Sequence, residues 1–253
     1  MSDLQEVARI LADARWIVAL TGAGISVDSG IPDFRSPGGL WDRFDPMEYA
    51  TIDAFLENPD KVWTMLKEMN ALISNANPNP GHTALAELEQ MGLLKAIITQ
   101  NIDNLHQEAG SREVIEFHGN GNQLVCLSCG SRYSAQEVAE RLERGADWPP
   151  ECPNDMQVLK PNVIFFGEAI PLEASHQARL QAARCDAMLV VGTSAMVFPA
   201  SSIPQLARQS GAVVVEINKT STQLTRTVAQ YTLQGSSSDI LPALVEEIRR
   251  ITA

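Results

Sequence analysis

The sequence contains no long hydrophobic run and few basic residues. Its apolar stretches, such as 187–192 and 212–217, are far shorter than the roughly 18 residues that a membrane-spanning helix requires. The first ten residues, MSDLQEVARI, lack the basic start and apolar centre of a secretion signal. We therefore expect no membrane association and a cytoplasmic protein.

Lysine and arginine supply only 19 of the 253 residues, against 31 aspartates and glutamates, so the net charge is −12. Such an acidic chain suits nucleic acid backbones poorly, and we expect no direct nucleic acid binding. The charge is compatible with docking basic peptides, although it is equally what solubility alone would favour. The length suits one large domain, or a domain with a small inserted lobe, and we expect a monomer.

Cysteine and histidine are also rare. The four cysteines are Cys126, Cys129, Cys152 and Cys185. Because the first three lie close together and the chain has no secretion signal, they indicate metal binding or redox chemistry rather than structural disulfides. Cys185 begins an apolar strand, and we expect it to be simply buried. Three of the four histidines are expected to pack, cap a helix or lie at the surface: His82, His106 and His176.

Apolar runs typical of buried strands alternate with segments of helical spacing. Strands are expected at 16–20, 96–99, 114–117, 163–166, 187–191 and 213–217. Helices are expected at 4–15, 52–74, 82–91, 135–144, 172–183, 199–209 and 240–251. This alternation predicts an α/β fold with a Rossmann-like parallel sheet and helices on both faces. The segment 126–160 breaks the alternation and is the natural candidate for a smaller inserted lobe.

A glycine-rich turn, TGAGIS at 21–26, follows the first strand directly. A strand that ends in Gly-x-Gly outlines a pyrophosphate site, because Gly22 and Gly24 let backbone amides approach phosphates. The next glycine is Gly30, so the spacing departs from the G-x-G-x-x-G fingerprint. On these residues alone a nucleotide site and a merely tight turn both remain open, and a hydride-transfer dehydrogenase is disfavoured.

The turn opens a longer block, GAGISVDSGIPDFR at 22–35, which resembles the sirtuin signature GAGISxxSGIPDFR. Further segments fit the same family in order: TQNID at 99–103, FHGN at 117–120, FFGE at 165–168, GTS at 192–194 and IN at 217–218. Together the matches span about residues 16 to 242, which is nearly the whole chain. The resemblance implies an NAD-dependent protein lysine deacetylase, which consumes NAD and an acetylated protein or peptide and yields deacetylated lysine, nicotinamide and O-acetyl-ADP-ribose.

The resemblance also implies one catalytic domain, 1–253, made of two lobes. The Rossmann-like lobe is expected at about 1–34, 82–120 and 162–253. The small lobe is expected to have a helical part at about 35–81 and a zinc-ribbon-like part at about 121–161.

Members of this family usually hold a structural zinc ion in the ribbon through two Cys-x-x-Cys pairs. Here the second pair reads CPND at 152–155, so the fourth ligand position falls on Asp155. Asp155 either completes a tetrahedron with Cys126, Cys129 and Cys152, or the site has decayed and binds no metal. Both alternatives stay open, because a carboxylate binds zinc less tightly than a thiolate does.

The family's functional residues carry over motif by motif. His118 would act as the general base, since the ordinary pKa of imidazole near ~6.5 suits that role, and Asn101 would assist catalysis. Asn101 and Asp103 would hold the nicotinamide carboxamide, Gln100 would reach the ribose, and Phe34 would cover its reactive face. The complete NAD-binding set is Gly22, Ala23, Gly24, Ser26, Asp33, Phe34, Arg35, Gln100, Asn101, Ile102, Asp103, Gly192, Thr193, Ser194, Asn218, Ser236 and Ser237.

The acyl-lysine peptide would add as a strand between the lobes. Its binding residues would be Val163, Phe165, Gly167 and Glu168, with Val163 and Phe165 lining an apolar tunnel. We expect Phe166 to belong to the core instead.

The acyl preference is partly readable. Sirtuins that prefer succinyl groups carry a tyrosine and an arginine in the helix after an NPxxVW stretch. Here that stretch is NPDKVW at 58–63, and the following TMLKEMNALI contains neither residue. We predict acetyl or longer neutral acyl groups, because an acidic group would meet no fixed cation.

Other functions could use the same NAD residues. A mono-ADP-ribosyltransferase or an NAD glycohydrolase on this fold would release nicotinamide without an acylated peptide. A non-enzymatic NAD sensor is disfavoured by the presence of His118.

Overall fold

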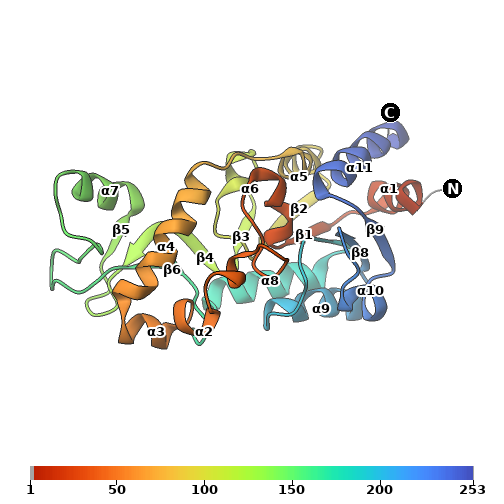
Figure 1. The fold of residues 1–253 in the computed structure, drawn as a ribbon. Coiled ribbons are helices and arrows are strands. Elements are labelled where there is room, and N and C mark those ends of the chain that lie inside the picture. The colour runs from red at the N-terminus through yellow and green to blue at the C-terminus, as the bar shows by residue number, and fades with distance from the viewer. Residues whose placement is uncertain (1–2, 253) are drawn as a thin grey trace.

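The computed structural model describes residues 3–252 (Figure 1). Residues 1, 2 and 253 of the predicted domain lie outside this described part. The larger lobe is built on six strands: β1 (Ile17–Thr21), β2 (Leu94–Thr99), β3 (Val114–Glu116), β7 (Ala187–Val191), β8 (Val213–Asn218) and β9 (Tyr231–Gln234). They form one sheet in the order β3-β2-β1-β7-β8-β9, and every neighbouring pair is parallel. The predicted Rossmann-like sheet is confirmed.

Helices cover both faces of this sheet (Figure 1). One face carries α1 (Asp3–Asp13), α5 (Pro80–Gln90) and α11 (Ser237–Thr252), and the other carries α8 (Leu172–Arg184), α9 (Ile203–Gln209) and α10 (Gln223–Thr227). Strands β1 and β7 are buried at every position. Because both of their faces are covered, they are continuous apolar runs rather than alternating ones. The burial expected for Cys185 is confirmed, with 4% of the residue exposed.

The smaller lobe combines helices with a three-stranded antiparallel sheet, and it matches the predicted two-part insertion. Its strands are β4 (Gly119–Val125), β5 (Arg132–Ser134) and β6 (Lys160–Val163), in the order β5-β4-β6. Its helices are α2 (Pro46–Tyr49), α3 (Ile52–Glu57), α4 (Pro59–Ser74) and α7 (Ala135–Glu143). One apolar core joins the two parts, and the Trp63 indole donates to the Leu159 carbonyl at 3.0 Å across it.

Short elements complete the described chain. They are the 3₁₀ turns η1 (Ala23–Ile25), η2 (Val27–Ser29), η3 (Leu40–Asp42) and η4 (Ala200–Ser202), and the helix α6 (Leu105–Glu108). Within residues 3–252, none of the helices has both the length and the apolar character that crossing a bilayer requires.

The single helix predicted over 52–74 is two helices. Asn58 ends the first and caps the second, because its side chain accepts the Lys61 N–H at 3.0 Å. Pro59 then occupies the first turn of α4, where its missing N–H does no harm. The apolar periodicity continues through this break, so it did not reveal the boundary.

The strand predicted at 163–166 is also wrong in its bounds, because β6 begins earlier and ends where the predicted strand begins. Beyond β6 the backbone changes partners: the Ile164 N–H donates to the His118 carbonyl at 2.9 Å, and Phe166 pairs with segment 50–52. Phe166 was expected in the core, but 39% of it is exposed. This segment therefore bridges the two lobes instead of extending one ladder.

Strands β1 and β7 end in a close backbone contact. The Gly24 N–H donates to the Gly192 carbonyl at 2.8 Å, and a Cβ on Gly24 would lie 2.7 Å from the Gly192 Cα. Gly192 has a φ of 60°, a left-handed conformation that favours glycine. Two glycines are thus required for the turn after β1 to rest on the end of β7.

We predict that Gly24→Ala lowers the free energy of unfolding by about 1–3 kcal/mol, the usual effect of overpacking. Urea denaturation measures this change. Gly121→Ala is the matched control, because a Cβ there would meet only the Ile102 carbonyl at 3.7 Å. Equal stability of the two variants would contradict the steric argument.

Candidate active site

The two lobes enclose a cavity of about 730 Å³ at the carboxyl ends of the parallel strands. His118, the four predicted peptide-binding residues and all predicted NAD-binding residues except two line this cavity. The exceptions are Ser236 and Ser237. The Ser236 hydroxyl donates to the Asp28 carboxylate, and Ser237 is buried at the start of α11. The structure therefore places both serines outside the cavity wall.

The turn after β1 forms the floor of the cavity. The Gly22 N–H donates to the Val191 carbonyl at 3.1 Å, which ties the turn to β7. Residues 22–24 line the cavity with backbone and very small side chains. A phosphate can therefore approach the main chain closely, as the Gly-x-Gly spacing predicts.

A polar network joins the turn to the segment after β2. Ser26 donates to the Asp103 carboxylate at 2.6 Å. The Asn101 amide donates to the Ser26 hydroxyl at 3.1 Å and to the Gly22 carbonyl at 3.2 Å. Both N–H donors of the Asn101 amide are used within this network, so Asn101 and Asp103 present acceptor oxygens that suit the N–H groups of a carboxamide ligand.

Two buried histidines stand behind this network, with ring centroids 4.9 Å apart. His82 caps α5 by accepting the Asn79 N–H at 3.3 Å, and its other ring nitrogen lies 3.5 Å from the Ser26 hydroxyl. His106 lies 2.9 Å from the Thr21 hydroxyl. Burial lowers the pKa of His82 to about 4 and that of His106 to about 3. Their expected packing and capping roles are confirmed, and His176 is exposed as expected.

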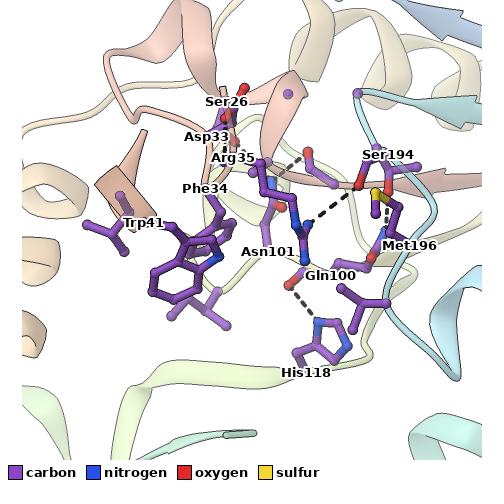
Figure 2. A pocket seen from close by; sticks show the side chains of 18 of the residues that line it. Ser26, Asp33, Phe34, Arg35, Trp41, Gln100, Asn101, His118, Ser194 and Met196 are labelled. Carbon is purple, nitrogen blue, oxygen red and sulfur yellow. Dashed lines mark hydrogen bonds between the residues drawn. The ribbon is translucent and has the colours of Figure 1, made fainter. Parts of the chain in front are cut away.

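His118 lines the cavity on the side opposite Ser26 (Figure 2). Its Nδ1 lies 3.1 Å from the Gln100 carbonyl. Because a carbonyl can only accept, Nδ1 carries the proton and Nε2 keeps a free lone pair. Burial lowers the pKa of His118 below its ordinary value, although the bond to Gln100 opposes this shift. The side chain is therefore a neutral base at physiological pH.

The loop after η2 covers the cavity. Asp33 forms a tight turn by accepting the N–H groups of Arg35 at 2.9 Å and Ser36 at 2.7 Å. Phe34 stacks on Trp41 with ring centroids 5.0 Å apart. Figure 2 shows the Arg35 side chain crossing toward Ser194, which it reaches at 3.5 Å. The loop is thus held by its own turn and by contacts on opposite walls.

Sequence reasoning missed one wall of the cavity. Met69, Leu72 and Ile73 of α4 line it. Their spacing places them on one face of the helix, and this spacing was the signal available in the sequence. Further lining residues at 196–199 and 220–222 lie in loops that follow β7 and β8, where apolar periodicity gives no signal, and Gln223 lines the cavity from the start of α10.

The predicted metal ligands converge in the small lobe. The ligand atoms of Cys126, Cys129, Cys152 and Asp155 all lie within 4.8 Å of one another. The Cys129 and Cys152 sulfurs are 3.7 Å apart, and both Asp155 oxygens lie 3.4 Å from the Cys126 sulfur. A tetrahedral zinc ion with Zn–S bonds of about 2.3 Å separates its ligand atoms by roughly 3.5–3.8 Å. The four residues therefore fit a structural zinc ion.

Comparison with known proteins gives one consistent result. Residues 22–199 match the sequence model of the Sir2 family. The chain is 47% identical to NAD-dependent protein deacylase 2 of Pyrobaculum aerophilum, covering 96% of this chain and 95% of that protein. It is 44% identical to the NAD-dependent protein deacylase of Pyrococcus abyssi, covering 97% and 98%.

Solved structures agree. One from work on the mechanism and regulation of Sir2 enzymes superposes with a TM-score of 0.92 at 42% identity, covering 98% of both chains. A Sir2 homologue in complex with NAD gives 0.89 at 39% identity, covering 98% and 95%. Sir2Af2 bound to a myristoylated histone peptide gives 0.83 at 37% identity, covering 99% and 98%.

We predict that the purified protein contains one zinc ion per chain and that Asp155→Ala loses it, because three thiolates leave the tetrahedron incomplete. Asp155→Cys should retain zinc at least as tightly as the natural residue does. Elemental analysis of each purified variant measures the metal. Full zinc content in Asp155→Ala would remove Asp155 from the ligand set.

Proposed function

The chain belongs to the Sir2 family, and we propose that its cavity uses NAD to remove acyl groups from lysine side chains of proteins. The NAD-dependent deacylases of Pyrobaculum and Pyrococcus support this function, since each is related over nearly its whole length. So do the similar structures with NAD and with an acylated peptide. The observation that carries the proposal is the hydrogen bond from His118 to the Gln100 carbonyl, because it orients a neutral base toward the space where a ribose hydroxyl would react.

Each side chain then has a proposed task in this reaction. The acyl oxygen of the lysine displaces nicotinamide at C1′ of the ribose, and the Nε2 of His118 then takes a proton from a ribose hydroxyl as that hydroxyl attacks the carbon of the resulting imidate. Asn101 and Asp103 hold the departing nicotinamide through its carboxamide. Phe34 covers the ribose after departure, so that water and returning nicotinamide are kept away. The phosphates rest on the turn at 22–24, and Ser194 and Arg35 contact them.

The remaining NAD contacts are proposals as well. Gln100 lies beside the ribose, where its amide already donates to the Thr193 hydroxyl at 3.1 Å. Asn218 follows β8 and donates to the Thr193 carbonyl at 3.0 Å, which orients its side chain for the adenosine end. The acyl-lysine peptide binds along Val163, Phe165, Gly167 and Glu168.

A zinc ion in the small lobe would serve structure rather than chemistry, since the Cys₃Asp set leaves no open coordination position. We further propose the division into a Rossmann-like lobe and a small lobe at the boundaries given above. The net charge of −12 supports the absence of nucleic acid binding. A monomer located in the cytoplasm is proposed on the sequence alone.

The wall from α4 supports a neutral acyl substrate. Met69, Leu72 and Ile73 are apolar, and among the described residues lining the cavity Arg35 alone carries a full positive charge. Arg35 faces Ser194 at the phosphate end. An acidic acyl group would therefore lose its hydration without gaining a cation.

We predict that nicotinamide release from NAD requires an acetyl-lysine peptide and falls at least about 100-fold in His118→Ala, because a general base typically contributes that much.

The pKa of His118 is lowered, and its neutral form is the base. Activity should therefore stay level as the pH falls to about 6.5, the ordinary pKa of imidazole, and decline only below it. A nicotinamide assay across pH measures both effects. Release without peptide would instead favour an ADP-ribosyltransferase or an NAD glycohydrolase.

We also predict that kcat/KM for a succinyl-lysine peptide lies at least about 100-fold below that for the acetyl-lysine peptide, whereas butyryl and myristoyl peptides remain substrates. Mass spectrometry of the acyl-ADP-ribose product shows which acyl group has been transferred. Met69→Arg adds a cation to the apolar wall, and it should lower the ratio of kcat/KM for the acetyl-lysine peptide to kcat/KM for the succinyl-lysine peptide. Efficient desuccinylation by the natural protein would contradict this assignment.

A further inference from the structure

Lys160 is a buried cation that the proposed chemistry does not use. It begins β6, and only 3% of its side chain is exposed. Its partner Glu168 lies eight residues later, with 20% of its side chain exposed. Lysine is almost never buried to this extent without partners, so its contacts indicate what it does.

The Lys160 ammonium group has three donors, and it meets three acceptors. Its Nζ lies 2.9 Å from the Glu168 carboxylate, 2.6 Å from the Val163 carbonyl and 3.2 Å from the Pro161 carbonyl. The same nitrogen lies 4.4 Å from the centre of the Phe165 ring, within the range of a cation–π interaction. All of these partners lie between residues 161 and 168.

Glu168 folds the segment back on itself. Its carboxylate accepts the Phe165 N–H at 2.7 Å, and its own N–H donates to the Phe165 carbonyl at 3.0 Å. Gly167 makes this return possible with a φ of 90°. Lys160 and Glu168 therefore fix both the start and the end of segment 163–168, and every residue of that segment lines the cavity.

Stability alone does not account for this arrangement. A buried ion pair is often no more stabilising than apolar side chains of the same size, because removing two charges from water is costly. What the pair supplies is a defined backbone geometry. Three acceptors held around one ammonium group constrain the path of residues 161–168.

We infer that Lys160 and Glu168 are positioning residues that hold segment 163–168 in the shape that receives the acyl-lysine peptide. The inference rests on the proposed function, because it assigns the peptide to this segment. Neither residue needs to touch the reacting atoms. Lys160 acts through Val163 and Phe165, and Glu168 acts through the backbone of Phe165.

The double variant Lys160→Met/Glu168→Gln tests this role, because it removes both charges, nearly keeps both volumes and leaves no unpaired charge. We expect its Tm to stay near that of the natural protein and above that of Lys160→Met alone, which leaves the charge of Glu168 without its cation. Calorimetry should show unchanged affinity for ADP-ribose. Affinity for an acetyl-lysine peptide, measured with ADP-ribose present, should fall about tenfold or more, since small misplacements weaken binding strongly.

Lys61→Met is the matched control, because Lys61 forms an exposed ion pair with Glu48 at 2.7 Å in the same lobe. It should leave both affinities unchanged. If the double variant does not fold, Glu168→Ala carries the same expectation for the two affinities, with a lower Tm because the Lys160 charge loses its counter-ion.

Natural peptide affinity in the double variant would overturn the inference, and so would an equal loss of affinity for peptide and ADP-ribose, which would mark a general structural defect. If the natural protein itself bound no acetyl-lysine peptide, the proposed function would fail first and the inference with it.

Discussion

The contact between Gly24 and Gly192 is the constraint on which the site depends. Two parallel strands end side by side, and their following turns can touch only because neither residue has a side chain. This contact keeps side chains away from the end of the sheet, where the turn at 22–24 forms the cavity floor and the proposed phosphate site. The residues that follow β2 and β8 are then brought to the same edge by parallel pairing.

From that edge, the site is assembled by side chains that hold one another. Asn101 reaches back to the turn at Gly22, and Gln100 presents its carbonyl to His118. One segment after β2 therefore orients both the proposed nicotinamide contacts and the base. A change in the strand register of β2 would displace the Gln100 carbonyl, Asn101 and Asp103 together, because they lie within the four consecutive residues 100–103.

The sequence predicted what contiguous patterns encode. Strands β1 and β7 were found because buried parallel strands are uninterrupted apolar runs, and the site residues were found because they lie in short motifs. The edge strand β9 was missed because only one of its four residues is buried. Strands β4 and β5 were missed because they are largely polar and half exposed.

The place of Ser236 depends on Asp28, a partner more than 200 residues away in the chain, and no local pattern reveals such a contact. Phe166 was misplaced for a related reason, since its position depends on pairing with segment 50–52, which is more than 100 residues earlier in the chain.

The buried pair of His82 and His106 gives the fold a weakness toward acid. An unfolded chain binds protons at both imidazoles once the pH falls below about 6.5. The folded chain resists this uptake, because burial lowers the two pKa values to about 4 and about 3. Protons therefore favour the unfolded chain progressively as the pH falls from 6.5 toward these values. These two rings pack behind the proposed nicotinamide contacts, so acidification destabilises the fold through groups that border the proposed active site.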